Sequence, residues 1–281
     1  MSGASGFVGT YLRTIFEQRG WSVQPLGRND FQLSAEELAA KMQGADVIVN
    51  LAGAPVISRW TDEYKKIMYD SRINVTKKLV EACSKMETKP KVFISTSAVG
   101  YYAAGGPHTE KKYKQDEGFL GSLAQNWERE ARKAETMGIR TMIFRFGIVL
   151  GRGGGALQQM ITPFKLGLGG TIGDGTQPFP WIHISDLSRV YVEAIDDESY
   201  NGIYNLTSPE TTTNKGLTKA LGTALGRPTL LPIPTFVLRL KFGEGAQALA
   251  SGQEVIPERL LEQGFQFQFK DIEKAVSDCV S

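Results

Sequence analysis

The chain has 281 residues, 41% of them hydrophobic and 22% charged, with a formal net charge of +2. This is enough for one large globular domain plus a smaller one. Lysines and arginines are scattered rather than striped, so they give no argument for a nucleic-acid partner. Two cysteines and two histidines argue against a disulfide framework or a metal cluster. We expect a cytoplasmic protein with a small-molecule partner, since no signal peptide or apolar stretch of transmembrane length is recognisable.

A glycine-rich turn opens the chain. Its pattern is G-x-x-G-x-x-G, and apolar residues follow it at helical spacing. A helix that begins in such a turn presents free N–H groups and its positive dipole end to a pyrophosphate. Because a strand must deliver the chain into the turn, we expect about five to ten further residues before Met1. We predict that the turn contacts a cofactor through Gly3, Ser5, Gly6, Phe7, Val8 and Gly9.

Strand and helix patterns alternate after this turn. Helical stretches separate the expected strands, which lie at 21–26, 46–51, 91–96 and 141–146. Continuous apolar strands are typical of sheets buried on both faces. This βαβ order predicts an α/β fold, a Rossmann-like doubly wound parallel sheet with ligands at the carboxyl ends of its strands.

The composition becomes richer in glycine and then in proline after residue 150. We predict a dinucleotide-binding domain over 1–150, with its sheet completed by about 176–207. A small, mostly helical substrate domain is expected to combine 151–175 with 208–281. One of its helices carries a stripe of leucines, and Asn214 is the expected N-cap of that helix.

The end of the expected strand at 21–26 indicates which nucleotide the protein prefers. In NAD-binding sheets an acidic residue about twenty residues past the glycine turn receives the adenosine ribose. Here the strand ends in Leu26-Gly27-Arg28, and a guanidinium matches a phosphate better than a ribose. We predict NADP(H), with Arg28 on the 2′-phosphate. Asp30 complicates this interpretation, and the alternative is that Arg28 is a solvated surface charge.

Two further strand ends carry small or hydroxyl side chains. Small residues let the backbone approach a nicotinamide ribose, as in Asn50-Leu-Ala-Gly-Ala54. The segment 95–102 places hydroxyls where a substrate carbonyl or alcohol would lie. We therefore add to the predicted cofactor contacts Leu51, Ala52, Gly53, Ser95 and Thr96.

These motifs together resemble the extended short-chain dehydrogenase/reductase superfamily, in its NAD-dependent epimerase/dehydratase group. The resemblance covers nearly the whole chain, and its tail is similar to a branch with a small C-terminal domain of unknown function. It implies an NADP(H)-binding oxidoreductase or epimerase that acts on a nucleotide sugar or another carbonyl or alcohol, as a monomer or homodimer. The residues that carry it are Gly3-x-x-Gly6-x-x-Gly9, Asn50–Gly53, Ser95–Ser97, Arg145–Gly151, Trp181–Asp186, Asn205–Pro209 and Val255–Pro257.

The chain departs from this superfamily at its expected catalytic pair, Tyr-x-x-x-Lys. None of the nine tyrosines has a lysine four positions later, and the two positions fall near Leu120 and Ala124. Ser97 matches the active-site serine of the resemblance, but a hydroxyl without an activated partner is a poor proton donor.

Two interpretations therefore remain open. In the first, another group supplies the proton: the candidates are Tyr101, Tyr102, His183 and Glu110, of which Glu110 is expected on a solvated loop. In the second, catalysis has been lost, and the protein is an NADPH-binding sensor or scaffold.

The glycine-rich loop 151–155 is a candidate substrate site. With Arg152 and the following helix it would make an anion site suited to the diphosphate of a nucleotide sugar. Phe164 and Trp181 would add an apolar wall. The alternative is a flexible glycine lid that holds nothing specific.

Overall fold

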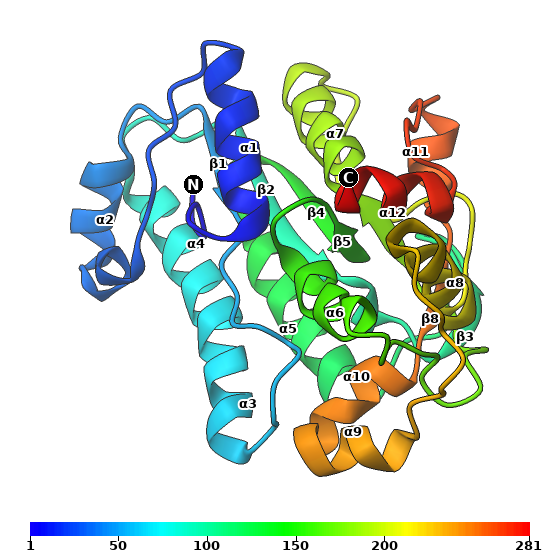
Figure 1. The fold of residues 1–281 in the computed structure, drawn as a ribbon. Helices are drawn as coiled ribbons and strands as arrows, with labels where there is room; N and C mark the ends of the chain where they lie inside the picture. The colour runs from blue at the N-terminus through cyan, green and yellow to red at the C-terminus, as the bar shows by residue number, and fades with distance from the viewer.

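The computed structural model describes residues 1–281 as a parallel sheet covered by helices on both faces, with further helices against its C-terminal part (Figure 1). The sheet consists, in spatial order, of β1 (Val47–Asn50), β2 (Val92–Ala98), β4 (Arg140–Phe146) and β7 (Gly202–Leu206). All three pairings are parallel. The Rossmann-like fold predicted from the sequence is confirmed.

The first two residues lie in the plane of this sheet. Ser2 forms parallel bridges with Leu26 on one side and with Asn50 on the other. The chain moves to one side of Ser2 first and returns to β1 on the opposite side, so the glycine turn begins at the topological switch point. The strand expected at 21–26 is reduced to a bridge at Leu26, which pairs with Ser2 and donates its N–H to the Met1 carbonyl at 2.8 Å.

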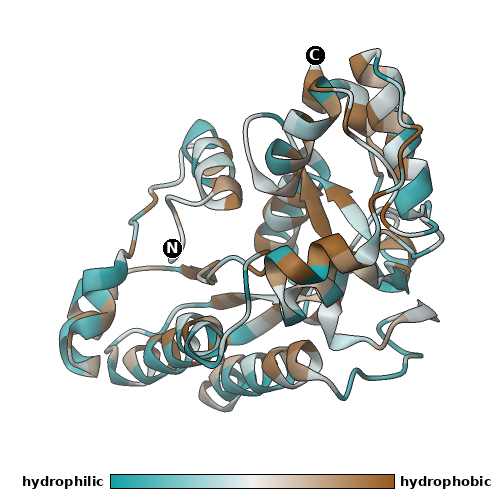
Figure 2. Cartoon of the chain, turned by 60° about the horizontal axis from the view of Figure 1, so that its bottom comes forward, coloured by the Kyte–Doolittle hydropathy of each residue, from teal (hydrophilic) through white to brown (hydrophobic).

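Helices cover the sheet on both faces because its residues alternate between two apolar cores. Ile94 of β2 faces the core under α1 (Phe7–Gln18) and α7 (Ile184–Asp196). The next residue toward the N-terminus, Phe93, faces the opposite core. That core lies under α2 (Ala35–Met42), α4 (Val75–Lys85) and α5 (Phe119–Arg132). Figure 2 shows brown apolar strands between helices that carry teal polar residues.

The helical stretch between β1 and β2 contains an irregularity. It consists of α3 (Asp62–Tyr69), a π-helical turn over Asp70–Asn74, and α4. A π turn inserts an extra residue and is frequent at functional sites. None of the helices combines the length and the apolar character that crossing a bilayer requires.

The C-terminal part is mostly helical. α6 (Gly155–Lys165), α8 (Asn214–Leu225) and α12 (Ile272–Val280) share a core around Trp181. Two short parallel pairs complete the sheets, and short helices lie between them. The strands are β5 (Ile148–Leu150) with β6 (Trp181–His183), and β3 (Gly105–His108) with β8 (Gln253–Val255); the helices are α9 (Thr235–Phe242), α10 (Gln247–Ala250) and α11 (Glu258–Glu262).

The N-cap of α8 is one residue earlier than expected. The Thr213 hydroxyl accepts the Gly216 N–H at 3.2 Å, so Thr213 is the cap and the prediction of Asn214 is wrong. Asn214 lies in the first turn and is buried, and its Oδ1 accepts the Ile172 N–H at 2.8 Å. Its amide therefore holds the glycine-rich segment before β6 instead of capping its own helix.

Candidate active site at the carboxyl ends of the strands

The glycine turn is shaped by close backbone approaches. Gly3 has φ +64°, and a Cβ there would lie 2.8 Å from the carbonyl carbon and oxygen of Leu51. A Cβ on Gly9 would lie 2.2 Å from the Gly3 carbonyl oxygen. Both distances are shorter than real contacts, so only glycine lets the turn lie against the end of β1 and against the first turn of α1.

The N-terminus of α1 is open. Gly6 is its N-cap and offers no side-chain acceptor. The backbone N–H groups of Phe7, Val8 and Gly9 donate no hydrogen bond within the protein. These free N–H donors and the positive end of the helix dipole suit the oxygens of a pyrophosphate. A side chain at position 3 would collide with the Leu51 backbone and prevent this shape of the turn.

A hydroxyl latch holds the next strand end beside this turn. Ser2 Oγ donates to Asn50 Oδ1 at 2.7 Å and accepts the N–H groups of Leu51 and Ala52 at 3.1 and 3.2 Å. Leu51, Ala52 and Gly53 are thereby placed along the switch point. Sequence reasoning did not single out Ser2, because a serine next to a glycine turn has no distinguishing spacing.

Arg28 lies at the other side of the switch point, at the start of a short 3-10 helix, and is exposed. Its guanidinium forms no ion pair. The Asp30 carboxylate has partners within the protein, since it accepts Lys41 Nζ at 2.5 Å and the Gly27 N–H at 2.7 Å. The Lys41 ammonium and this backbone bond hold the pKa of Asp30 below its usual range. The Asp30 carboxylate is thus paired with a cation of its own, and Arg28 stays the predicted contact to a 2′-phosphate.

The hydroxyl residues at the end of β2 point to different sides of the sheet. Thr96 Oγ1 is 3.3 Å from Tyr191 Oη of α7, whereas Ser97 Oγ donates to Glu128 Oε1 of α5 at 2.7 Å. Ser95 is buried, and its Oγ reaches only the Thr96 carbonyl, at 3.4 Å. The structure does not bring all three hydroxyls to one ligand-facing surface, because side chains alternate along a strand.

Glu128 and Arg145 form a buried, bidentate ion pair beneath Ser97. Arg145 Nε and Nη2 each donate to a Glu128 oxygen at 2.7 Å, and the two side chains are 1% and 5% exposed. Burial opposes the arginine charge, but the Glu128 carboxylate prevails and raises the pKa of Arg145. This planar two-bond geometry is the strong form of an arginine–carboxylate pair. Neither residue was singled out individually as a site residue from the sequence.

The network continues to the edge of the site. Arg145 Nη1 donates to Tyr102 Oη at 2.8 Å, and Tyr102 Oη donates to Asn205 Oδ1 at 2.7 Å. The Arg145 guanidinium carbon lies 3.5 Å from the centre of the Tyr101 ring, a cation–π contact. Three strands contribute to this network, since Ser97, Arg145 and Asn205 are in register on β2, β4 and β7.

Burial raises the pKa of the three candidate proton donors Tyr101, Tyr102 and Glu110. Burial, followed by a hydrogen bond with Tyr113, raises the pKa of Tyr101, so its phenol is protonated at neutral pH. Burial also raises the pKa of Tyr102 to about 12. Glu110 Oε1 accepts the Asn205 N–H at 2.8 Å, and burial raises the pKa of Glu110. The residues that follow Glu110 in its loop are exposed, as expected, but the Glu110 side chain itself is turned inward against β7 and is only partly exposed.

No titratable side chain stands where the resemblance expects the catalytic pair. Leu120 is within packing distance of Gly100, where a Cβ would lie 3.4 Å from the leucine Cβ. Ala124 is 3% exposed and belongs to an apolar part of α5. Positions 120 and 124 of this helix therefore present only hydrocarbon, and the polar partner that α5 gives Ser97 is Glu128.

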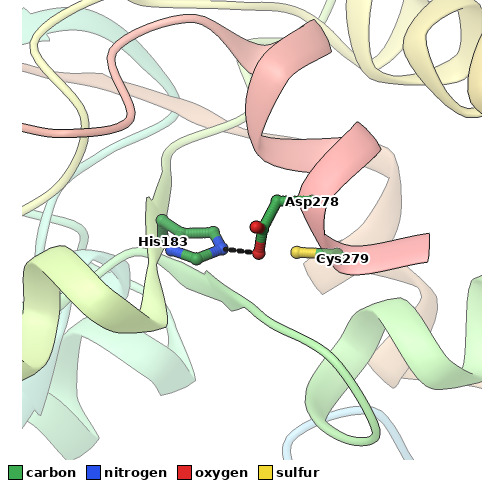
Figure 3. Close-up of side chains that lie close together, drawn as sticks. All are labelled: His183, Asp278 and Cys279. Carbon is green, nitrogen blue, oxygen red and sulfur yellow. Dashed lines mark ion pairs between the residues drawn. The ribbon is translucent and has the colours of Figure 1, made fainter. Parts of the chain in front are cut away.

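His183 is tied to the C-terminal helix, as Figure 3 shows. Its Nδ1 accepts the Ser185 N–H at 3.2 Å, so Nε2 carries the proton of the neutral ring and points to Asp278 Oδ2 at 3.3 Å. The ring stacks on Phe269 with centroids 3.8 Å apart. Cys279 Sγ lies within 4.8 Å of the same atoms, but a metal would need Nε2 unprotonated, against this tautomer. A catalytic role for His183 stays a prediction, and its contacts are those of a structural histidine.

We expect His183 to make stability depend on pH. Burial lowers the pKa of His183, against the opposing charges of Asp278 and Asp186, whereas an unfolded histidine titrates near 6.5. The unfolded chain then binds more protons just below pH 6.5, so the free energy of unfolding should fall as the pH falls through 6.5. His183→Asn keeps an oxygen acceptor for the Ser185 N–H and should flatten this slope in urea denaturation between pH 7.5 and 5.5. Equal slopes in both proteins would show that the folded histidine is not shifted.

The three predicted substrate contacts lie in the C-terminal core or at its edge. Arg152 Nη2 donates to the Asp278 carbonyl at 3.0 Å and contacts Ser281 Oγ at 3.2 Å, at the end of α12. Phe164 and Trp181 are 4% and 1% exposed and pack with the helices. Contact between these residues and a substrate stays a prediction, since their present partners are all parts of the protein.

The amino-acid sequence is similar to those of known proteins over its whole length. Residues 1–207 match the model of the NAD dependent epimerase/dehydratase family, and residues 233–279 match a domain of unknown function, DUF1731. The mouse epimerase family protein SDR39U1 is 37% identical over 100% of this chain and 99% of its own length. The protein YfhF of Bacillus subtilis (strain 168), also an epimerase family protein, is 34% identical over 100% of this chain and 97% of its own length.

Solved structures show the same fold. The human epimerase family protein SDR39U1 (isoform 2), crystallised with NADPH, superposes with a TM-score of 0.90 and 34% identity, over 99% of this chain and 97% of that one. The cofactor expected from the sequence, NADP(H), is the one in that crystal structure. A nucleoside-diphosphate sugar epimerase from Corynebacterium glutamicum superposes with a TM-score of 0.80 and 29% identity, over 99% of this chain and 57% of that one. This chain belongs to the NAD dependent epimerase/dehydratase family.

Proposed function

We propose that the protein binds NADP(H) at the switch point and is an epimerase-like oxidoreductase that acts on a carbonyl or alcohol substrate. The open N-terminus of α1 beside the free guanidinium of Arg28 carries the cofactor assignment. The free N–H groups suit the pyrophosphate, and the guanidinium suits a 2′-phosphate. The NADPH bound by the human relative supports the same choice.

We propose that Ser97 holds the reacting oxygen of the substrate. The Ser97 hydroxyl donates its proton to a hydrogen bond with Glu128, so its oxygen lone pairs can accept a hydrogen bond from a substrate hydroxyl. The neighbouring phenol of Tyr101, protonated at neutral pH, is the candidate donor to a carbonyl. Bound NADP(H) would supply or accept the hydride, and the residues of this chain would orient the substrate and exclude water.

We propose that the substrate lies between two domains, residues 1–150 with 176–207 and residues 151–175 with 208–281. At one side of this space the two proposed domains meet, the loop after β1 and α3 contacting the end of α9 and the turn after it. The Trp60 N–H donates to the Phe242 carbonyl at 3.4 Å, and Lys65 pairs with Glu244. A nucleotide sugar is the substrate class suggested by the Corynebacterium relative.

Ser97→Ala is the experiment that tests a catalytic role. In a screen of carbonyl and nucleotide-sugar substrates that follows NADPH oxidation, turnover should fall by about a hundredfold or more, because the substrate oxygen loses its partner. NADPH affinity, measured by fluorescence titration, should not change. Ser122→Ala, on the exposed side of α5, is the matched control.

The second candidate is an NADPH-binding sensor or scaffold without turnover. The hydrocarbon side chains of Leu120 and Ala124 favour it, because the proton-transferring pair of the resemblance is missing there. Tight NADPH binding with no oxidation by any substrate in the screen would support this candidate and contradict the enzyme.

A further inference from the structure

Large apolar side chains lie exposed on one part of the C-terminal helices. Leu230, Phe236 and Leu240 are 85%, 69% and 79% exposed, and no residue of α9 is buried. More than half of the large apolar side chains that the molecule exposes belong to two segments, one just after α6 and one from Leu230 through α9. An exposed apolar patch of this kind indicates a contact with something outside the chain. We call the following residues the α9 surface: Leu168, Leu230, Leu231, Phe236, Val237 and Leu240.

Hydrogen bonds hold the two segments of the α9 surface side by side. The Ile233 N–H donates to the Thr171 carbonyl at 2.6 Å, and the Gly173 N–H donates to the Ile233 carbonyl at 3.0 Å. A Cβ on Gly170 would lie 1.7 Å from the Leu231 carbonyl oxygen, so the two stretches of backbone are in contact. α9 begins two residues after Ile233, at the lower edge of the molecule in Figure 1. The exposed leucines of both segments therefore belong to one surface with α9.

The exposed side chains of α9 form an apolar stripe with a cation on either side. Successive residues of a helix are about 100° apart around its axis, so Phe236, Leu240 and Val237 together cover about 100°. Arg239 lies about 60° before this stripe, and Lys241 lies about 40° beyond it. The two residues of α9 that are only partly exposed lie on the opposite side. An apolar stripe between long cationic side chains is typical of a helix that lies in the plane of a bilayer interface.

The charge of the two segments is positive and uncompensated. Residues 211–243 contain no aspartate or glutamate, and neither do residues 155–173. The cations of these segments that lie nearest to the α9 surface in the chain are exposed and form no ion pair: Lys165, Arg227, Arg239 and Lys241. Glu244, the next acidic residue after α9, pairs with a lysine of α3. A partner of this surface must therefore combine hydrocarbon with negative charge.

Charge complementarity decides between the possible occupants. A second copy of the chain in a two-fold contact would place Arg239 and Lys241 against the same two cations, and like charges repel. A helix of another protein fits a groove, whereas the apolar side chains here stand out from the exposed side of a short helix. An anionic bilayer offers its apolar interior to the stripe and its phosphate groups to the flanking cations.

We propose that the α9 surface binds the protein to the interface of an anionic lipid bilayer. Phe236 and Leu240 then lie at the boundary between headgroups and acyl chains, while Arg239 and Lys241 contact the lipid phosphates. This contact is with one leaflet only, and it requires no helix that crosses the bilayer. It uses neither the glycine turn nor Ser97, so it goes beyond the proposed function and does not depend on it.

Sedimentation of the full chain with lipid vesicles tests this proposal. The vesicles contain either phosphatidylcholine alone or equal parts of phosphatidylcholine and the anionic lipid phosphatidylglycerol. Affinity for the anionic vesicles should be higher by about tenfold or more, because each cation near an anionic surface contributes to binding. This difference should shrink as salt is added, because salt screens exposed charges.

Two double variants separate the apolar contribution from the charge. Phe236→Ser with Leu240→Ser should weaken binding to anionic vesicles by about tenfold or more, because two apolar side chains no longer leave water. Arg239→Gln with Lys241→Gln should remove most of the difference between the two kinds of vesicle. All four side chains are exposed, so NADPH affinity and the free energy of unfolding should not change.

Leu261→Ser is the matched control, because Leu261 is also an exposed leucine but lies on α11, far from α9 in Figure 1. It should bind vesicles as the wild type does. The proposal is overturned if the wild type binds no vesicles, if it binds both kinds equally, or if Leu261→Ser loses as much affinity as the double serine variant. A lipid-free dimer that the double serine variant abolishes in sedimentation velocity would assign the surface to a second copy and also overturn it. Failure to bind NADPH would contradict the proposed function alone.

Discussion

Arg28→Ala should erase most of the preference of this protein for NADPH over NADH. The Arg28 guanidinium is exposed and unpaired two residues after the bridge at Leu26, where we expect the adenosine ribose, and the Asp30 carboxylate pairs with Lys41 and the Gly27 N–H. A charged hydrogen bond to a phosphate contributes about 1.5–3 kcal/mol, so NADPH affinity should fall by about ten- to a hundredfold. NADH affinity should hardly change, because NADH has no phosphate at that position.

Calorimetric titration of both cofactors into both proteins measures this difference. Arg19→Ala is the matched control, since Arg19 is also an exposed arginine but lies at the far end of α1 and pairs with Asp196 at 2.8 Å. It should leave the preference intact. Equal affinities of the wild type for NADPH and NADH would show that Arg28 is a solvated surface charge.

Glu128→Ala should be the most destabilising single change near the site. It removes the carboxylate that holds Arg145 with two bonds of 2.7 Å and accepts the Ser97 hydroxyl. Breaking one side of a buried pair leaves a charge without compensation, at a cost of about 3–5 kcal/mol in the free energy of unfolding. Urea denaturation of the protein without cofactor measures this loss.

Two further variants separate the charge from other effects of the substitution. Glu130→Ala is the matched control on the same helix: Glu130 is also buried, but its partner Lys133 is 53% exposed, so the ammonium left behind remains hydrated and the loss should be much smaller. The double change Glu128→Ala with Arg145→Met should recover part of the stability, because no unpaired charge is left. A double variant no more stable than Glu128→Ala would contradict this explanation.

The hydrogen bonds of Ser97 explain why this serine alone cannot supply the proton for a reaction. In this chain the serine hydroxyl donates to a carboxylate, and the helix positions expected to carry the tyrosine and lysine hold Leu120 and Ala124. Tyr101 stacks on Arg145 with its ring and has a raised pKa. If the proposed oxidoreductase activity exists, its acid would be the protonated phenol of Tyr101, and the substrate screen with Ser97→Ala tests whether there is turnover at all.

The sequence by itself determined the fold, and it predicts where the cofactor binds. The spacing of glycines and the alternation of apolar strands with helices are local properties of the chain. They were enough to predict the turn at Gly3–Gly9 and the parallel sheet. The Ser34–Glu37 capping box likewise begins α2 as its spacing predicts. Strand boundaries were less reliable because they depend on pairing partners, as at 21–26, where only Leu26 forms a bridge.

Only the tertiary structure decided which polar side chains act together. Ser97 and Glu128 are 31 residues apart, and Glu110 meets Asn205 across 95 residues. No spacing rule links such pairs, because their contact depends on how helices pack on the sheet. The burial of Arg72, which forms no ion pair, was equally impossible to predict from the sequence. An arginine in a helical stretch normally faces water, and only the π turn and the gap at Gly53 bury this one without a carboxylate.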